Sequence, residues 1–521
     1  MPAHTRLSVR ISTALLAATA LVLSGCTTAG NAEGKEALQA EINEVTSDPR
    51  LAAGTWSILA IDASNGDIVY ESNPDAPLVP GSIAKTFTTG TALAQLGPDS
   101  RVTTTVQGLG ELTAGVLNGD LVLVGAGDFS FGLREQSDGS LEYTGFDHNE
   151  ANTGLLPVQL TSGDPLGGLK DLARQLQQAG ITQVTGDVIV DNRLFEAQTS
   201  WPDGRIDSIW VNENTFDVVL TPGTPGQPPA VEVRPALKGV TVQNDASTVA
   251  GSEVEIDVTD QGGGRLLVSG QIGAEAGQTI RMAQVSDPVG FARMAFTEVL
   301  AETGITVDGA AETNPAERLP AQYPESPLAA RESATLAERV RVIQKISFNR
   351  GADLTACLIA VRAGSTECQD GLPVILDTIE GLGTPPGSVY LFDAAGSIDY
   401  DRISAAGQVG FLRGALDTDW GQYLYDAMPI SGVDGSLASL GKGTASEGMI
   451  HAKTGSRLVG YPARNTLFYA AQAYSGYLTA ASGRELVFTV IFNSTTADSI
   501  DEVLETGARI GDVALALQQH G

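Results

Sequence analysis

Histidine and cysteine are scarce in this chain of 521 residues, which has four histidines and three cysteines. His148 and His520 form no metal-ligand spacing with each other or with the cysteines. His451 is interpreted as structural, and no Asp–His pair indicates a Ser-His-Asp triad. The sequence therefore predicts neither a metal site nor another cofactor.

Basic residues are also few. Lys and Arg number 31 against 62 Asp and Glu, which leaves a formal charge of −31. Such a negative surface repels a phosphate backbone, so nucleic acid is excluded as a partner. Charged residues make up 18% of the chain and hydrophobic residues 42%. These fractions exclude a disordered or coiled-coil protein and predict a globular chain of two or three domains.

One apolar run lies near the N-terminus, and it is too short to span a bilayer. Residues 11–23 are uncharged and rich in Ala and Leu, and two arginines precede them. This pattern is typical of an export signal. The run ends in Leu-Ser-Gly-Cys26, which resembles the bacterial lipobox. We therefore predict a lipoprotein signal peptide at 1–25 with lipid attached to Cys26; the alternative is an ordinary signal peptide followed by an incidental cysteine.

A lipid on Cys26 would hold the protein at the outer face of the cell membrane, and without it the protein would be in the cell wall or secreted. The small and polar residues of 26–35 are predicted to form a flexible tether.

The other two cysteines have two interpretations. Cys357 and Cys368 can form a disulfide, because an exported chain meets an oxidising exterior. Alternatively, Cys357 is a core thiol, since it shares an apolar helical stripe with Leu354 and Leu358. Neither interpretation is catalytic.

The two ends of the chain predict parts of one α+β domain, assigned to residues 36–103 and 329–521. The expected elements are strands at 56–61, 67–70, 449–455 and 485–492, a helix that opens around Ser82 and stops at Gly97-Pro98, and a helix over 500–517. Between these parts, residues 104–328 are rich in short Val/Leu strands separated by Gly and Asp. We predict that they form a large, mostly β insertion of one or two domains, nested with a break near 221–285.

Three short motifs bear chemistry: Ser82-Ile83-Ala84-Lys85, Ser347-Phe348-Asn349 and Lys453-Thr454-Gly455. Because lysine is rare, Ser-x-x-Lys is expected by chance about 0.5 times and Lys-Thr-Gly about 0.05 times. The three motifs in this order are therefore a specific signal. A second Ser-x-x-Lys at Ser439 lies in a Gly/Ser-rich stretch without helical pattern and is discarded.

The context of each motif favours a reactive pocket. Ser82 at a helix start would meet free N–H groups, and Lys85 lies three residues along the same face. Ser347 falls between two predicted helices, where either it or Asn349 could instead only cap the second helix. Lys453 would lie on a strand that starts at Met449 and ends with this motif. On that strand edge it could bind the carboxylate of an added peptide.

These motifs resemble those of the penicillin-binding proteins and serine β-lactamases. The long gap between the first two motifs is similar to that of the D-alanyl-D-alanine carboxypeptidase/endopeptidase family, the class C low-molecular-mass penicillin-binding proteins. The resemblance implies a penicillin-binding transpeptidase/β-lactamase-like domain with an insertion. It also implies a cell-wall enzyme that acts on peptidoglycan stem peptides and is inhibited covalently by β-lactam antibiotics.

The resemblance implies a mechanism as well. Ser82 would form an acyl-enzyme after attack on D-Ala-D-Ala, Lys85 would be the base, and Ser347 would pass a proton to the leaving amine. The residues implied to bind the substrate and its developing oxyanion are Asn349, Lys453, Thr454, Gly455 and Ser456.

Two departures from the family pattern support alternatives. Residues 393–398 read Asp-Ala-Ala-Gly-Ser-Ile where the family usually has Asp-Gly-Ser-Gly-Leu-Ser, and Phe129 replaces a proline after Gly127-Asp128. The first departure favours an inactive lipoprotein that binds the cell wall. A β-lactamase is a further alternative, although no spacing nominates a deacylating carboxylate.

Overall fold

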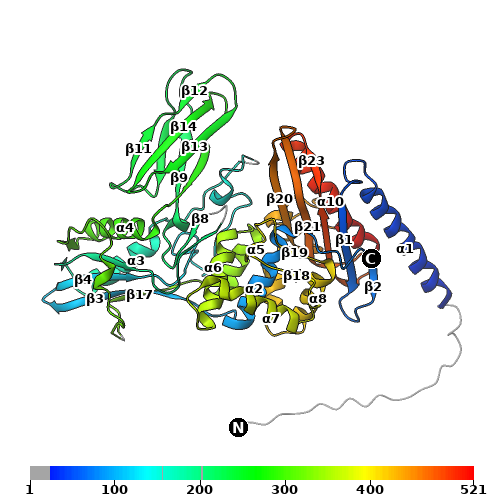
Figure 1. Ribbon diagram of the computed structural model, residues 1–521, viewed down its shortest axis with the longest axis horizontal. Helices are drawn as coiled ribbons and strands as arrows, with labels where there is room; N and C mark the ends of the chain where they lie inside the picture. Colours follow the sequence, from blue (N-terminus) through cyan, green and yellow to red (C-terminus); the bar gives the residue numbers. More distant parts are fainter. Residues whose placement is uncertain (1–23, 155–156, 201–203, 325) are drawn as a thin grey trace, which may run out of the picture.

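The computed structural model describes residues 24–521 except 155–156, 201–203 and 325 (Figure 1). The predicted signal peptide therefore lies almost entirely outside the described residues. Helix α1 (Ser24–Thr46) covers 26–35, where the sequence predicted a flexible tether. The difference has a local reason, because Ala, Glu, Lys and Leu from residue 32 onward are strong helix formers. Among the described helices, none is both long enough and apolar enough to cross a membrane.

One antiparallel sheet contains strands from both ends of the chain, in the spatial order β2-β1-β22-β21-β20, with β23 beside β21. Its strands are β1 (Thr55–Asp62), β2 (Ile68–Ser72), β20 (Ile450–Tyr461), β21 (Thr466–Thr479), β22 (Glu485–Asn493) and β23 (Thr495–Ala497). β1 pairs with β22 over its whole length, so the two chain ends form one α+β domain, as predicted. We call it the main domain.

β20 continues to Tyr461 instead of ending at Gly455 as predicted, because it forms a long hairpin with β21 that closes at Thr466. The strand therefore carries the third motif in its interior. It still lies at the edge of the sheet.

Helices cover both faces of this sheet. On one face, α1 and α10 (Ile500–His520) bury Leu38, Ile42 and Val513 against the strands (Figure 1). The helices that pack on the other face or against one another there are α2 (Lys85–Leu96), α5 (Leu336–Lys345), α6 (Asn349–Arg362), α7 (Gly371–Gly381), α8 (Ala405–Leu416) and α9 (Gly421–Ala427). The three motifs lie where this second helical layer meets the sheet.

The insertion has its own sheet, with the strand order β16-β5-β4-β3-β17 and β6 beside β4. Its elements are β3 (Thr103–Thr113), β4 (Val116–Val124), α3 (Gly167–Gln178), β5 (Gln183–Val184), β6 (Val188–Asp191), α4 (Pro288–Glu302), β16 (Thr306–Val307) and β17 (Ala329–Glu332). Because β17 pairs with β3, the insertion sheet extends to Glu332, beyond the predicted return at 329.

Further strands of the insertion lie between residues 198 and 284, apart from that sheet (Figure 1). They are β7 (Gln198–Ser200), β8 (Gly204–Ile206), β9 (Thr215–Thr221), β10 (Ala230–Arg234), β11 (Thr241–Asn244), β12 (Ser247–Val249), β13 (Val254–Asp260), β14 (Arg265–Gly273) and β15 (Thr279–Gln284). β10 to β15 fall within the segment predicted to be nested at 221–285.

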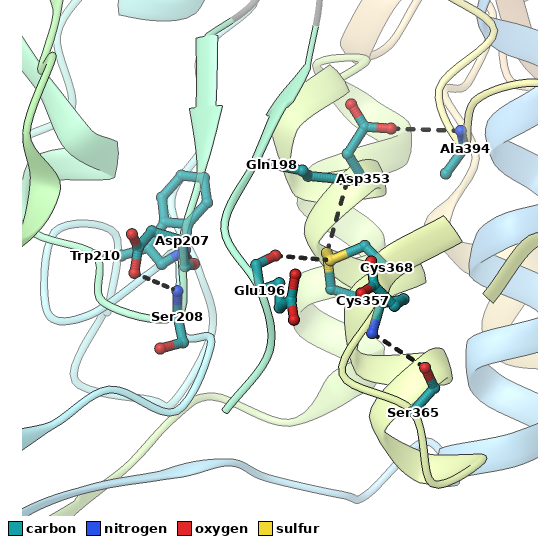
Figure 2. The surroundings of a disulfide bond; sticks show 11 residues. Glu196, Gln198, Asp207, Ser208, Trp210, Asp353, Cys357, Ser365, Cys368 and Ala394 are labelled. Carbon is teal, nitrogen blue, oxygen red and sulfur yellow. Dashed lines mark hydrogen bonds between the residues drawn. A yellow bond between two sulfur atoms is a disulfide. The ribbon is translucent and has the colours of Figure 1, made fainter. Parts of the chain in front are cut away.

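The two cysteines of the main domain form a disulfide, which settles the choice between the two interpretations. Cys357 on α6 is bonded to Cys368, eleven residues later, and both side chains are buried. Figure 2 shows Glu196 and Gln198 of the insertion beside the two sulfurs. Gln198 Nε2 lies 3.8 Å from Cys357 Sγ. The disulfide thus lies at a contact between the insertion and α6.

Removal of this disulfide is expected to destabilise the main domain. A crosslink that closes a loop of this length stabilises a protein by about 3 kcal/mol, chiefly by restricting the unfolded chain. The double variant C357A/C368A should therefore lose about this much free energy of unfolding in denaturant titrations. Dithiothreitol should lower the midpoint of the native protein and leave that of the variant unchanged. If the native protein and the variant have equal midpoints in the absence of dithiothreitol, the expectation is wrong.

Candidate active site

Ser82 lies in a short 3-10 helix, η1 (Gly81–Ala84), that leads directly into α2. The sequence placed Ser82 at the start of an α-helix, whereas the α-helix begins at Lys85. Gly81 has a φ of +56°, and a Cβ atom there would lie 2.8 Å from the backbone nitrogen of Ser456. Glycine is therefore required at this position, because η1 and strand β20 approach each other closely. We call the turn formed by η1 the catalytic turn, since it carries Ser82.

The amine of Lys85 is the centre of the site. Its side chain is fully buried, and Nζ donates hydrogen bonds to Ser82 Oγ at 2.7 Å and to Asn349 Oδ1 at 2.5 Å. A third bond goes to the carbonyl oxygen of Ala395 at 2.8 Å. The amine is therefore within reach of the hydroxyl proton of Ser82. Ala395 was not among the predicted site residues, since a backbone carbonyl has no sequence signal.

Ser347 lies between α5 and α6, as predicted, in a left-handed conformation with a φ of +60°. Its hydroxyl accepts a hydrogen bond from Lys453 Nζ at 2.9 Å. The N-cap of α6 is Phe348, which makes no side-chain capping bond. The alternative that Ser347 or Asn349 only caps this helix is therefore wrong. A non-glycine residue in this region costs about 1–3 kcal/mol, and surrounding contacts must hold it there.

Those contacts come from the insertion. The ring of Phe348 packs edge-on against Phe129 and Trp210, with centroid distances of 5.3 and 6.5 Å. The guanidinium of Arg350 donates to the backbone carbonyl of Glu213 at 2.7 Å. Phe348, which lies between Ser347 and Asn349, and Arg350, which follows Asn349, are thus anchored in the insertion. Nothing in the sequence around Phe348 predicted this anchor.

Lys453 lies on β20 with its side chain fully buried. Burial, followed by the positive charge of Lys85, holds the pKa of Lys453 well below its ordinary value. Besides Ser347, its amine donates to the carbonyl of Thr454 at 2.7 Å. Thr454 in turn donates from its hydroxyl to Ser436 Oγ at 2.6 Å. Ser436 is a residue of the site that the motif search did not identify.

Gly455 brings β20 against the catalytic turn. A Cβ atom at this position would lie 2.3 Å from the carbonyl oxygen of Pro80 and 3.0 Å from the backbone nitrogen of Ser82. The same contact brings Ser456, whose hydroxyl donates to Gln472 at 2.7 Å, next to Gly81. The backbone N–H groups of Ser82 and Ser456 therefore lie along one short contact between η1 and β20.

His451 and His148 lie in structural surroundings. His451 stacks on Tyr425 at a centroid distance of 4.3 Å, and burial lowers its pKa. His148 lies in a buried ionic cluster of the insertion; burial opposes its charge, but Asp217 and Glu213 raise its pKa to about 10. Over the described part of the chain, no group of three or more His, Cys, Asp or Glu side chains is arranged to hold a metal ion.

A serine and lysine at the start of a buried helix, a Ser-x-Asn loop and a Lys-Thr-Gly edge strand define the penicillin-binding and serine β-lactamase class of active sites. Residues 38–510 match the model of the D-Ala-D-Ala carboxypeptidase 3 (S13) family, and the chain belongs to this family. Its enzyme class is therefore that of a serine-type D-Ala-D-Ala carboxypeptidase.

Relatives and solved structures agree with this membership. A D-alanyl-D-alanine carboxypeptidase of Actinomadura sp. (strain R39) is 25% identical over 488 residues, which cover 88% of this chain and 81% of the relative. Penicillin binding protein 4 (dacB) from Haemophilus influenzae has the same fold, with a TM-score of 0.72 at 18% identity over 92% of this chain and 99% of that chain. A second structure of that protein, complexed with a β-lactam, has a TM-score of 0.69 at 18% identity over the same shares of the two chains.

The contact between β20 and η1 predicts the effect of one methyl group. Gly455→Ala should lower the rate of acylation by a penicillin about 10²-fold, because the added carbon displaces the strand from Ser82 and misplaces the reacting groups. Gly460→Ala is the matched control on the same strand, since a Cβ atom there meets nothing within 4 Å. Stopped-flow acylation and melting temperatures of both variants test this. Equal acylation rates for the two folded variants would rule out the close contact.

Proposed function

We propose that this protein hydrolyses peptidoglycan stem peptides that end in D-Ala-D-Ala, through an acyl-enzyme on Ser82. The observation that carries the proposal is the hydrogen bond of 2.7 Å between Lys85 Nζ and Ser82 Oγ in a buried site. Membership of the S13 family supports the same substrate class. The D-Ala cross-links of the cell wall present the same type of bond, so endopeptidase action uses the same groups.

Acylation begins when Ser82 Oγ attacks the carbonyl carbon of the penultimate D-Ala. Lys85, in its neutral form, takes the hydroxyl proton as the new C–O bond forms. The carbonyl oxygen becomes negative in the tetrahedral intermediate and accepts hydrogen bonds from the backbone N–H groups of Ser82 and Ser456. Each donor of this kind stabilises the transition state by roughly 3 kcal/mol.

The leaving group needs a proton before the terminal D-Ala can depart. Ser347 Oγ, hydrogen-bonded to Lys453, donates this proton to the amine nitrogen as the C–N bond breaks. Ser347 regains a proton from Lys85, which had taken it from Ser82, so that Lys85 is neutral again. Water then attacks the acyl carbon and gives up a proton to Lys85, which returns it to Ser82 Oγ as the acyl C–O bond breaks. The products are the shortened peptide and D-Ala.

The edge position of β20 explains how the substrate is held. A peptide lies along this edge as an added strand, and Lys453 and Thr454 bind its terminal carboxylate. Asn349 hydrogen-bonds the amide of the substrate, and Gly455 leaves room for its backbone. β-Lactams are covalent inhibitors in this proposal, because they offer a carbonyl and a carboxylate in the same arrangement. The β-lactam complex of the Haemophilus influenzae protein supports this.

Labelling with a fluorescent penicillin tests the proposal. The native protein should retain the label, and Ser82→Ala should abolish labelling, because it removes the oxygen that forms the acyl bond. Ser439→Ala, in the second Ser-x-x-Lys sequence, is the matched control and should label normally. Release of D-Ala from a peptide ending in D-Ala-D-Ala should follow the same order.

The other outcomes exclude the proposal in distinct ways. Rapid loss of the label with accumulation of hydrolysed penicillin identifies a β-lactamase. A folded native protein that takes up no label and releases no D-Ala identifies a binding protein without catalysis.

We further propose that the protein is exported and anchored to the outer face of the membrane by lipid on Cys26. The support is the charge pattern of residues 1–25 and the Leu-Ser-Gly-Cys sequence at their end. Two or more acyl chains hold a protein stably on a membrane. Without lipidation the protein would be free in the cell wall or medium.

Replacement of Cys26 tests the anchor. The native protein should partition into detergent, and mass spectrometry should find acyl chains on an N-terminal Cys26. Cys26→Ser should be recovered from the aqueous phase with unchanged penicillin labelling, since the active site lies in another part of the chain. Aqueous partitioning of the native protein would show that Cys26 carries no lipid.

A further inference from the structure

The loop that departs from the family pattern lies directly against the catalytic turn. It connects β18 (Val389–Tyr390) to β19 (Arg402–Ile403). Its Ala395 carbonyl accepts a hydrogen bond from Lys85. A Cβ atom on Gly396 would lie 2.1 Å from the carbonyl oxygen of Gly81. The conformation of this loop therefore determines the hydrogen bond between the Lys85 amine and the Ala395 carbonyl.

A single carboxylate organises the tip of the loop. Asp393 accepts from the backbone nitrogens of Ala395 at 2.9 Å, Gly396 at 2.6 Å and Ser397 at 3.0 Å. It also accepts from the hydroxyl of Ser397 at 2.5 Å. Four donors thus converge on Asp393 and fix the turn around the Ala395 carbonyl. All four bonds are accepted by Asp393. None of them involves the side chains of Ala394 and Ala395, the two positions after Asp393 where this chain departs from the family pattern.

A second carboxyl group, that of Asp401, interacts with Asp393. Asp401 is fully buried, and its Oδ1 accepts from the backbone nitrogen of Phe392 at 2.7 Å. Its Oδ2 is buried and receives no hydrogen bond from any donor of the described residues. Burial first, and then the charge of Asp393, raise the pKa of Asp401 to about 8. A proton on Oδ2 gives that oxygen a partner, because it can be donated to the Asp393 carboxylate.

The other charged groups around the pair are engaged elsewhere. Asp353 on α6 accepts from the nitrogen of Ala394 at 3.3 Å (Figure 2). Arg402 donates to the backbone carbonyl of Asp401 at 2.7 Å, and Arg457 on β20 pairs with the exposed Asp399 at 2.9 Å. Lys85 contacts the loop through Ala395. None of these side chains donates to Asp401 Oδ2.

We propose that Asp393 and Asp401 are positioning residues that share one proton, and that this proton fixes the loop so that Ala395 holds the Lys85 amine against Ser82. The inference rests on the proposed function, since it gives Lys85 its role as the base. When the proton is lost, two negative charges face each other in a buried site, and the turn around Ala395 loosens.

The direction of the pH effect follows from the raised pKa. An unfolded Asp401 ionises near 3.8 and the folded one near 8, so the contribution of this group to stability is complete below about pH 4. It is lost progressively as the pH rises to 8. Acylation by penicillin should decline as the pH rises through 8, because the loop then loses its shared proton.

Asp401→Asn is the informative variant, because its amide can donate permanently to Asp393. Compared with the native protein, its melting temperature should fall less between pH 5 and 9. Its acylation rate should lie within about twofold of the native rate at pH 6 and be at least threefold higher at pH 9. Asp399→Asn, which removes an exposed carboxylate from the same loop, is the matched control and should keep the native pH dependence of both quantities.

Infrared spectroscopy of the native protein tests the shared proton without any variant or activity. The spectrum of the native protein should contain a protonated carboxyl band at pH 6 that disappears around pH 8. The spectrum of Asp401→Asn should lack this band at both pH values. Absence of this band, or the native pH dependence in Asp401→Asn, would overturn the proposal. If penicillin labels no form of the protein, the proposed function fails, while the infrared and melting measurements still decide whether the proton is shared.

Discussion

Burial of the Lys85 amine is the constraint on which the site depends. A buried amine must have hydrogen-bond partners, and the three acceptors come from the catalytic turn, from α6 and from the loop after β18. None of these segments is near another in sequence. The fold therefore has to bring them together before any of the three motifs can act. The departure at residues 393–398 is compatible with this, because the loop contributes a backbone oxygen and not a side chain.

The second constraint is the proximity of two lysines. The charge of Lys85 disfavours a charge on Lys453, and burial acts in the same direction. Ser347 lies in hydrogen-bond contact with Lys453, while Asn349 contacts Lys85. The segment Ser347–Asn349 therefore contacts both amines, Lys453 through Ser347 and Lys85 through Asn349. The left-handed conformation of Ser347 is held in place because Phe348 and Arg350, which follow it, are anchored in the insertion.

The insertion thus packs against the segment of the main domain that carries Ser347 and Asn349. Trp210 and Phe129 pack on Phe348, and the segment at Glu196 and Gln198 lies against the disulfide of α6 (Figure 2). These contacts stabilise the start and the middle of the same helix. The size of the insertion and its distance in sequence from the motifs gave no indication of this role.

Much of the fold and of the site was predictable from local chemistry. Apolar periodicity and turn signals predicted the strands β1, β2, β20 and β22 and the helices α2 and α10, and three motifs predicted Ser82, Lys85, Ser347, Asn349 and Lys453, which the fold brings together. The errors have different causes. Residues 26–35 are helical because strong helix formers lie among them, whereas β20 extends to Tyr461 because it forms a hairpin with β21, and β17 belongs to the insertion because β3 pairs with it. The pairing of β17 with β3, which is far away in the sequence, leaves no mark within either strand.

The amino-acid sequence by itself determined which side chains carry the chemistry, because nucleophile, amine and amide must be particular residue types in a particular order. Tertiary structure alone decided the partners of those side chains: the Ala395 carbonyl, the Ser436 hydroxyl, the aromatic anchor of Phe348 and the contact between Asp393 and Asp401. A backbone oxygen or a buried carboxyl has no signature of its own. Such a group affects the site only when it is buried and close to the catalytic side chains, and both conditions exist only in the folded chain.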